Sequence, residues 1–304
     1  MVLKAKLGIA PIAWSNDDLP QLGGETPLTV CLSESRQAGF QGVETGGKFP
    51  KTTPELRTVL NEYQLDLVSG WYSGTLLDNT VEEEIKKSLP QIQLFRDCGA
   101  ACLVYGETAG TIQNRQDIPL DKRRRLTDEQ MAIYAEKLSQ YAAFCRDFGV
   151  PLAFHHHMGT AIEDEHDIDR LMAATSMDVG LLFDAGHLVF AGVDPMSVLI
   201  KHGERINHVH TKDVRAEVLQ SLDWQRHSFL DAVLKGVYTV PGDGMIDFTV
   251  IINQLAKIGY EGWFVVEAEQ DPAKAPPLEY AQIGYKTLRT ALDQAGYTLI
   301  KGAF

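Results

Sequence analysis

Short apolar runs alternate with longer amphipathic segments along most of this chain. Eight of the short runs are rich in Val, Leu, Ile and Phe and do not alternate cleanly with polar residues, which is typical of parallel strands buried on both faces. The strands predicted in this way are Leu7–Ala13, Gly42–Glu44, Leu65–Trp71, Cys102–Tyr105, Pro151–His155, Val179–Phe183, Ile206–His210 and Trp263–Glu267.

Helical patterns fill the stretches between these runs. Thr127-Asp128-Glu129-Gln130 has the form of a capping box, and Gly39, Gly149 and Gly259 each stand between a helical pattern and an apolar run, where a left-handed residue ends a helix. The predicted helices are Pro27–Ala38, one opening at Thr53-Pro54-Glu55, Val81–Cys98, one from Thr127 to near Gly149, Glu165–Thr175, Pro195–His202, Phe248–Ile258 and Pro277–Ala295.

This strict alternation of strand and helix predicts right-handed parallel crossovers. Eight such units favour a single (β/α)₈ TIM barrel over an open sheet, because the turn after the first strand lacks the glycine-rich motif of a nucleotide-binding sheet. No low-complexity linker divides residues 1–304, so we expect one domain. The long polar stretches Thr108–Leu126 and Arg215–Val240 both follow strands and are expected to cover the carboxyl end of the barrel.

Charge and composition narrow the class of partner. The chain carries 28 Lys and Arg against 41 Asp and Glu, a formal charge of −13, which argues against a nucleic-acid-binding surface. The one dense basic run, Lys122–Arg125, adjoins Asp121 and Asp128 and is interpreted as a solvated approach to a helix. No apolar stretch is long enough to span a membrane. The expected partner is therefore a small molecule, and a homo-oligomer is left open.

The ends of the chain and its cysteines predict a cytoplasmic protein. The first residues lack the apolar segment of a signal peptide. The cysteines are irregularly spaced and each lies in an apolar run, which predicts free thiols in a reducing compartment rather than disulfides or a zinc site. They are Cys31, Cys98, Cys102 and Cys145.

Ionisable side chains gather where the predicted strands end. Six of the nine histidines lie at only three strand ends, and Asp184, His210 and Glu267 follow the last three strands. Because the carboxyl ends of barrel strands meet at one face, these side chains should converge there. Histidine nitrogens and carboxylate oxygens together suit a divalent ion such as Mn²⁺, Co²⁺, Zn²⁺ or Mg²⁺. The alternation of a strand turns His156 away from His155 and His157, which makes it a structural residue.

Three segments resemble the xylose-isomerase-like superfamily of sugar isomerases, epimerases and dehydratases: Asp184-Ala185-Gly186-His187, His208-Val209-His210-Thr211-Lys212-Asp213 and Gly262–Glu267. Within it, three further segments are similar to the inosose dehydratases, and the resemblance spans nearly the whole chain. These segments are Leu7–Asp18, Val43-Glu44-Thr45-Gly46, and His155–Thr160 with Glu163.

The resemblance implies a divalent ion, Mn²⁺ or Co²⁺ above the others, held by Asp184, His210, Glu267 and a fourth ligand. Many relatives have a glutamate at the end of strand five, where this chain has His155. Glu163 follows eight residues later and would restore an acid-rich set of ligands. We therefore expect Glu163 as the fourth metal ligand, with His155 as the alternative.

The activity implied is that of a hydro-lyase in myo-inositol catabolism, which removes water from 2-keto-myo-inositol to give a trihydroxycyclohexane-1,2-dione. It would proceed through a metal-stabilised enediolate, which requires a base near the α-carbon and an acid for the departing hydroxide. The candidates for proton transfer are His157, His187, Lys212 and Glu44. The candidates for contact with the ring of the substrate are Trp14, His155, Trp71 and Tyr72.

Two other functions fit the same pattern. A metal-dependent ketose 3-epimerase or sugar isomerase would share the enolate chemistry, but such enzymes usually carry the strand-five glutamate that His155 replaces here. A barrel that binds a polyol without turning it over would have no need for the Asp184, His210 and Glu267 set. The fold by itself does not choose among these activities.

Overall fold

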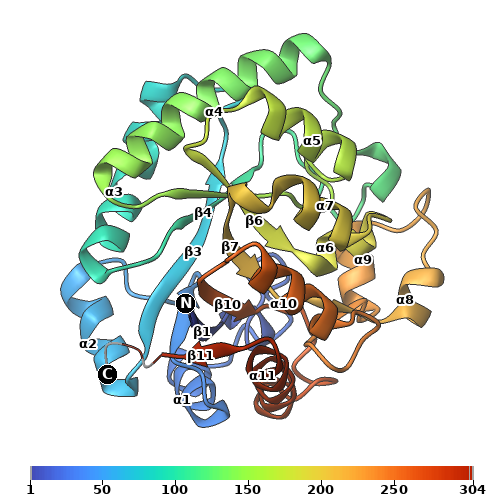
Figure 1. The fold of residues 1–304 in the computed structure, drawn as a ribbon. Coiled ribbons are helices and arrows are strands. Elements are labelled where there is room, and N and C mark those ends of the chain that lie inside the picture. Colours follow the sequence, from blue (N-terminus) through green and yellow to red (C-terminus); the bar gives the residue numbers. More distant parts are fainter. Residues whose placement is uncertain (1, 301, 303–304) are drawn as a thin grey trace.

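Eight parallel strands close into a ring in the computed structural model, which describes residues 2–300 and 302 (Figure 1). Pairing of the last barrel strand with the first, Ala5 to Gly262 through Ile9 to Val266, completes the closure. The predicted TIM barrel is therefore confirmed. Its strands are β1 (Leu3–Ile9), β2 (Gly42–Thr45), β3 (Asp66–Gly74), β4 (Leu103–Glu107), β5 (Leu152–His155), β6 (Val179–Asp184), β7 (Ile206–His210) and β10 (Gly262–Val266).

Helices surround this ring and pack on its outer face (Figure 1). Their ends follow the local signals of the sequence: Thr127 and Gln130 form a complete capping box, and Gly39, Gly149 and Gly259 all have positive φ. The main helices are α1 (Leu28–Ala38), α2 (Thr53–Tyr63), α3 (Val81–Cys98), α4 (Asp128–Phe148), α5 (Glu165–Ala174), α7 (Pro195–His202), α10 (Phe248–Lys257) and α11 (Pro277–Gln294).

Most strands differ from their predicted boundaries by one or two residues, and two strands differ by more. The first strand begins at Leu3 and ends at Ile9, because Pro11 has no N–H for the ladder and instead opens the short 3₁₀ turn η1 (Pro11–Ala13). The third strand continues three residues past Trp71, where Tyr72–Gly74 pairs with β4. Both changes affect the end of the barrel that carries the candidate site.

The sequence pattern did not predict several short elements. Helix α6 (Ala185–Phe190) starts directly after Asp184, which caps it by accepting from the His187 N–H. The stretch after β7 forms a small antiparallel ribbon with two short helices, and a last strand adds to β1 outside the ring. These elements are β8 (Asp213–Val214), α8 (Ala216–Gln220), α9 (Phe229–Leu234), β9 (Tyr238–Thr239) and β11 (Tyr297–Leu299), with the 3₁₀ turns η2 (Leu120–Lys122) and η3 (Gly203–Arg205).

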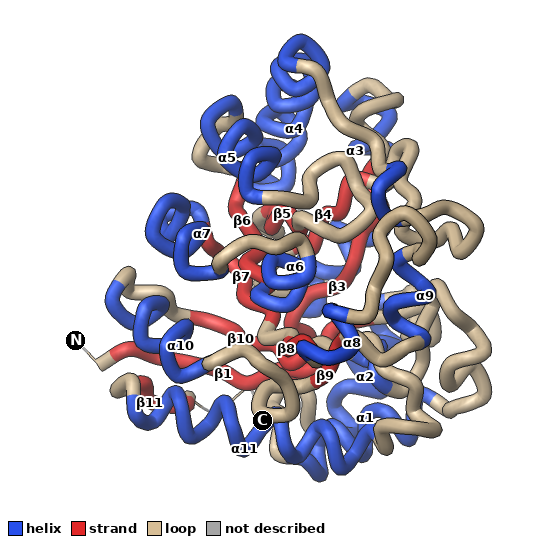
Figure 2. The backbone as a smooth tube through the Cα atoms, turned by 90° about the vertical axis from the view of Figure 1, so that its right-hand side faces the viewer, coloured by secondary structure: helices blue, strands red, loops and turns tan. Residues whose placement is uncertain are grey.

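Long connections gather at one end of the barrel. Figure 2 shows these loops with α8 and α9 at the opposite end from the N-terminus. The stretches 108–126 and 215–240, predicted to be covering loops, belong to this group, and the first of them borders the main cavity. Side chains at the carboxyl ends of the strands are therefore enclosed by these connections.

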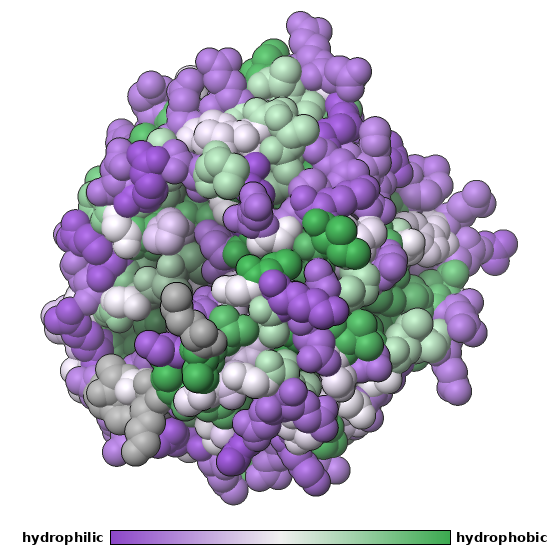
Figure 3. All heavy atoms as spheres, viewed as in Figure 1, coloured by the Kyte–Doolittle hydropathy of each residue, from purple (hydrophilic) through white to green (hydrophobic). Residues whose placement is uncertain are grey.

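One face of the molecule is hydrophilic around its edge. Figure 3 shows hydrophilic side chains over most of the periphery of one face, with hydrophobic ones nearer its middle. Within the described part of the chain, no helix combines the length and the apolar character needed to cross a membrane. All four cysteines are free; Cys98 is partly exposed and the others are buried.

Candidate active site

A cavity of about 670 Å³ opens at the carboxyl ends of the strands. Its floor includes His155, His210 and Glu267, and its walls include Trp71 and His157. The loop after β4 contributes a further wall through Thr108, Thr111, Gln113, Asn114 and Arg115. The space is large enough for a small cyclic polyol, since pockets for small ligands start at about 300 Å³.

Four atoms that can accept hydrogen bonds meet at the floor of this cavity. His210 Nδ1 lies 3.5 Å from Asp184 Oδ2 and 3.8 Å from Glu267 Oε2, and His155 Nε2 lies 3.6 Å from the same Asp184 oxygen. Asp184 Oδ2 and His210 Nδ1 are buried and have no hydrogen-bond partner, and buried Glu267 Oε2 is paired with the Lys212 ammonium. Such orphaned atoms are costly unless a cation binds them.

The backbone and Glu44 determine which nitrogen of each histidine carries a proton. His155 Nδ1 contacts the carbonyl oxygen of His156, which can only accept, so this nitrogen carries the hydrogen. His210 Nε2 donates to Glu44 Oε1 at 3.1 Å. In neutral form, both rings thus present a bare nitrogen to Asp184, as a metal ligand must.

These donors fit a divalent ion. Two imidazole nitrogens and two carboxylate oxygens form a ligand set for Mn²⁺, Co²⁺ or Zn²⁺. Bonds of about 2.1 Å place neighbouring ligand atoms roughly 3.0–3.5 Å apart, near the separations seen here. The ligand atoms of His155, Asp184 and His210 all lie within 4.8 Å of one another.

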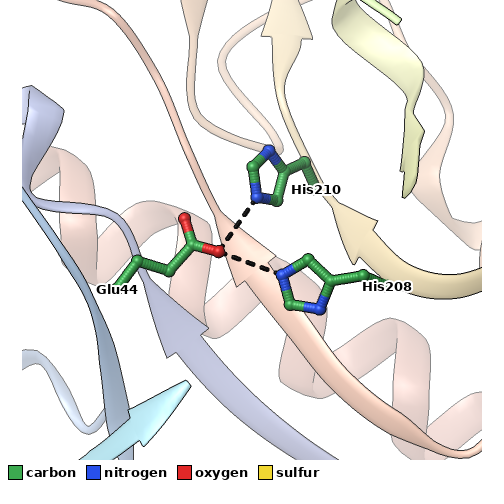
Figure 4. Close-up of side chains that lie close together, drawn as sticks. All are labelled: Glu44, His208 and His210. Atoms are coloured by element: carbon green, nitrogen blue, oxygen red, sulfur yellow. Dashed lines mark hydrogen bonds and ion pairs between the residues drawn. The ribbon is translucent and has the colours of Figure 1, made fainter. Parts of the chain in front are cut away.

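Glu44, at the end of β2, lies behind this cluster. Figure 4 shows His208 and His210 aiming at the same oxygen of Glu44, with Nε2–Oε1 distances of 3.0 and 3.1 Å. Ser69 Oγ also donates to this oxygen. Glu44 was a candidate for proton transfer, but three donors already hold its Oε1, which favours a role in orienting His210.

The electrostatics of the floor favour added positive charge. Burial opposes the imidazolium, yet Glu44, Asp184 and Glu267 raise the pKa of His210 to about 10. Burial alone would raise the pKa of Glu44, but His210 and His208 hold it well below its usual range. In the absence of an ion, a proton on His210 compensates the surrounding carboxylates.

Lys212 lies next to this cluster and is fully buried. Its Nζ is 2.6 Å from Glu267 Oε2, 2.8 Å from Glu269 Oε2 and 2.9 Å from His187 Nε2. Burial disfavours the ammonium, but Glu267, Glu269 and Asp184 raise the pKa of Lys212 above its usual value. Among the described residues, Lys212 forms ion pairs with Asp184, Glu267 and Glu269 and none with Asp213 or Glu44, so its charge is directed to the site.

His187 and His157 stack beside Lys212, with ring centroids 3.9 Å apart. His187 Nδ1 lies 3.0 Å from the hydroxyl of Tyr238. His157 Nδ1 donates to the carbonyl of Met158 at 2.8 Å, so its Nε2 keeps a free lone pair. Burial and the neighbouring Lys212 lower the pKa of His157 to about 3, and the ring is therefore neutral near pH 7.

The structure does not bring Glu163 to the cluster. Its Oε1 pairs with Arg123 Nε at 3.0 Å, and its Oε2 accepts from Gly159 N–H at 2.6 Å. Arg123 comes from the loop after β4 and also binds Asp164 and Asp167, each at 2.7 Å. The expectation that Glu163 is the fourth ligand is corrected: His155 stands beside Asp184 instead, while Glu163 fastens the covering loop.

Two of the four candidate contacts with substrate face elsewhere. Trp14 is buried, and its Nε1 donates to Glu34 Oε2 at 2.6 Å. Tyr72 donates to Glu84 at 2.8 Å and packs with Tyr105 and Tyr141. Neither Trp14 nor Tyr72 borders the main cavity. For Tyr72 the reason is the pleat of β3, which turns its side chain to the face opposite that of Trp71. Their predicted role is corrected to one of packing.

The other two candidates do border the cavity. The Trp71 ring meets His155 and His157 edge-on, with both centroid distances 5.7 Å. Glu269 and Tyr238, which the sequence analysis left without a role, contact Lys212 and His187. Glu269 could have been predicted, because it lies two residues after Glu267 and therefore on the same side of an extended chain. Nothing in the sequence indicates a role for Tyr238, which lies in a long connection.

The family of the chain follows from comparison with known proteins. Residues 32–297 match the family described as xylose isomerase-like TIM barrel. The chain belongs to the xylose isomerase-like TIM barrel family. This xylose isomerase-like chain is 49% identical over 298 residues to the rhizopine catabolism protein MocC of Rhizobium meliloti, covering 98% of this chain and 92% of that protein.

The expected resemblance to inosose dehydratases is also confirmed. The chain is 46% identical over 280 residues to the inosose dehydratase of Geobacillus thermodenitrificans, covering 91% of this chain and 94% of that enzyme. The inosose dehydratase of Bacillus thuringiensis (strain Al Hakam) is 44% identical over 278 residues, covering 91% of this chain and 93% of that enzyme.

Solved structures share the fold of this xylose isomerase-like chain at low identity. An L-ribulose 3-epimerase superposes with a TM-score of 0.67 at 17% identity, covering 96% of this chain and 95% of the other. The IOLI protein, solved with a binding zinc atom, gives 0.65 at 17% identity, covering 95% and 99%. At such identity, the likeness supports the barrel and not a particular reaction.

Proposed function

We propose that this barrel is a metal-dependent hydro-lyase that removes water from 2-keto-myo-inositol, an inosose, to give a trihydroxycyclohexane-1,2-dione. The observation that carries the proposal is the convergence of three buried ligand atoms, Asp184 Oδ2, His210 Nδ1 and Glu267 Oε2, at the floor of the cavity, the first two of them without a hydrogen-bond partner. The inosose dehydratases at 44 and 46% identity support the choice of substrate.

The proposed ligands are His155, Asp184, His210 and Glu267, with Mn²⁺ or Co²⁺ as the ion. When bound, the ion would polarise the ketone and an adjacent hydroxyl of the substrate and stabilise the charge that develops on the enolate oxygen. Glu44 holds His210 in the tautomer that leaves Nδ1 free for this purpose.

We assign removal of the α-proton to His157. Its Nδ1–H is engaged by the carbonyl of Met158, which leaves the Nε2 lone pair as the only proton acceptor on the ring. His157 also borders the cavity beside Trp71, so a substrate ring in the cavity would lie against both side chains. The fixed tautomer leaves Nε2 free to accept a proton from a substrate bound in the cavity.

We assign protonation of the departing hydroxide to the pair of Lys212 and Glu269. Lys212 is fully buried, whereas Glu269 borders the cavity and burial raises its pKa to about 7, so the Glu269 carboxyl gives the proton to the leaving group. The Lys212 ammonium, bonded to Glu269 Oε2, stabilises the carboxylate that remains. His187 accepts a hydrogen bond from Lys212 and keeps its Nζ directed at the two glutamates. His187 therefore acts as a positioning residue.

The experiment that tests the proposal is an assay of the metal-stripped and the Mn²⁺- or Co²⁺-loaded protein on 2-keto-myo-inositol beside a panel of ketohexoses. Appearance of the dione chromophore only with metal supports the dehydratase. Epimerised sugar without loss of water would replace it by the epimerase function. Binding of the inosose without turnover, in protein shown to carry metal, would point to a polyol-binding barrel.

A further inference from the structure

Lys212 lies where a second metal ion would lie. Its Nζ is surrounded by Glu267 Oε2 at 2.6 Å, Glu269 Oε2 at 2.8 Å and His187 Nε2 at 2.9 Å. All three are typical metal-ligand atoms. His157, His187 and Glu269 can also bring one ligand atom each within 4.8 Å of one another. The site therefore contains a second set of ligand types beside the proposed metal centre.

Glu267 links the two sets. One of its oxygens, Oε2, lies 3.8 Å from His210 Nδ1 in the metal centre and 2.6 Å from Lys212 Nζ. This oxygen is buried and is paired with the ammonium on one side. A carboxylate placed between two cations in this way is the arrangement of a two-metal site, in which neighbouring ions lie about 3.5–4 Å apart.

We infer that the Lys212 ammonium is a built-in second cation, which holds the place of a second metal ion and limits the site to one. The inference rests on the metal centre of the proposed function. The three carboxylates within 4 Å of Nζ are those of Asp184, Glu267 and Glu269, with a combined charge of −3. One divalent ion and one ammonium supply +3 and balance them.

The fixed ammonium suits dehydration better than a second ion. The ammonium donates hydrogen bonds to Glu269 Oε2 and His187 Nε2, and its covalent tether keeps the positive charge in place through each turnover. The stem of Lys212 is also built into the fold: a Cβ at Gly186 would lie 2.6 Å from Lys212 Cγ, so glycine at this position makes room for it. The side chain is enclosed on all sides and cannot swing out without opening the core.

The inference predicts that removal of Lys212 uncovers a second metal site. Wild-type protein, stripped with a chelator and titrated with Mn²⁺, should saturate at one ion per chain. Lys212→Ala should saturate at two, with an electron paramagnetic resonance spectrum broadened by coupling between neighbouring ions. Lys212→Arg should remain at one, and the double variant Lys212→Ala/Glu269→Gln should return to one, because it lacks a ligand of the second site.

A matched control lies on the surface. Lys201 Nζ also touches two carboxylates, Glu165 Oε1 at 2.7 Å and Asp169 Oδ2 at 2.8 Å, and His202 contacts the same Asp169. These groups are partly exposed, so water can solvate them when the lysine is removed. Lys201→Ala should therefore gain no ion.

Each outcome decides between the two proposals. Wild-type protein that binds no metal ends the proposed metal centre, and this inference with it. One ion in wild type and one in folded Lys212→Ala ends this inference alone, as does a second ion in wild type. If Lys212→Ala does not fold without metal, we expect its native circular dichroism to return when two Mn²⁺ per chain are added. If neither Lys212→Ala nor Lys212→Ser recovers in this way, the inference is overturned.

Discussion

His210 and Glu44 form a fixed pair in which one ring nitrogen donates and the other is left bare. The Nε2–Oε1 distance is 3.1 Å, and the opposite nitrogen, Nδ1, faces the buried oxygens of Asp184 and Glu267. His208 and Ser69 bind the same Glu44 oxygen, so the carboxylate itself cannot turn. The orientation of His210, a proposed metal ligand, thus depends on Glu44, which belongs to a strand of the barrel that is not its neighbour.

Substitution of this carboxylate should weaken metal binding without removing a ligand. We expect Glu44→Gln to lower Mn²⁺ affinity about 10–100-fold, the range for groups that orient ligands, because an amide can present N–H to His210 and favour the wrong tautomer. Isothermal titration calorimetry measures the effect. Glu107→Gln, which alters a buried strand-end carboxylate outside the cluster, should leave the affinity unchanged; equal losses in both variants would contradict the role of Glu44.

Glu163 and Asp184 should behave differently when their charge is removed. Asp184→Asn should abolish tight metal binding, since it alters a proposed ligand. Glu163→Gln should retain the metal but lower the free energy of unfolding by about 1–3 kcal/mol, because buried Arg123 loses one of its partners. Urea denaturation and metal titration of both variants check this. Loss of metal in a stably folded Glu163→Gln protein would restore Glu163 to the ligand set.

Removal of the proposed base should affect turnover and not the metal. His157→Gln is expected to lower kcat by about 10²-fold or more, the usual effect of a lost general base, with metal content near that of wild type. Steady-state kinetics and exchange of the α-hydrogen with solvent deuterium should fall together. Unchanged exchange in this variant would move the role of base to another residue.

The aromatic residues at the end of β3 offer a test within two adjacent positions. Trp71→Ala should raise KM for the inosose at least about 10-fold, because it removes a wall of the cavity beside His157. Tyr72→Phe should leave KM and kcat near wild type, since the hydroxyl serves Glu84 only. The same kinetic assay covers both, and a comparable rise in KM for Tyr72→Phe would show that the hydroxyl reaches the substrate.

Glu107 should make stability depend on pH. Burial raises the pKa of Glu107 to about 7, although Ala109 N–H and the Tyr105 hydroxyl donate to it. The folded state therefore holds a proton that the unfolded chain has released above pH 4.5. This contribution to stability is complete below pH 4.5 and is lost as pH rises through about 7.

Glu107→Gln should remove that dependence. Relative to the variant, wild type should lose about 1–3 kcal/mol of unfolding free energy between pH 4.5 and pH 8. Chemical denaturation at several pH values measures it. A difference that is constant across this range would show that Glu107 titrates in the same way in the folded and unfolded states.

Much of the architecture was predictable because it depends on local patterns. Buried parallel strands and capped helices leave clear marks, as at Thr127 and Gly149, and closure into a ring follows from the number of units. The cluster of Asp184, His210 and Glu267 was also predictable, since residues that end barrel strands must converge. Boundaries were less certain where a proline, such as Pro11, ends a ladder.

The fate of Glu163 could not be predicted from its neighbours. It depends on Arg123, which lies 40 positions earlier, in a loop whose path has no periodicity to read. Similarly, the partner of His187, Tyr238, comes from a strand of only two residues in a long connection. Contacts between such loops are set by tertiary packing, to which local propensity gives no guide.

The ring closes between the parts of the chain that are made first and last. Strand β1 pairs with β10 and, at its start, with β11, and the Lys4 N–H binds the Glu261 side chain across 257 positions of sequence. Such distant contacts are slow to form, since a long loop must be closed before they contribute. Glu267 and Glu269 directly follow β10. A chain emerging from the ribosome thus acquires a complete set of proposed ligands only at the step that joins its two ends, and a partly closed barrel would hold its ion weakly.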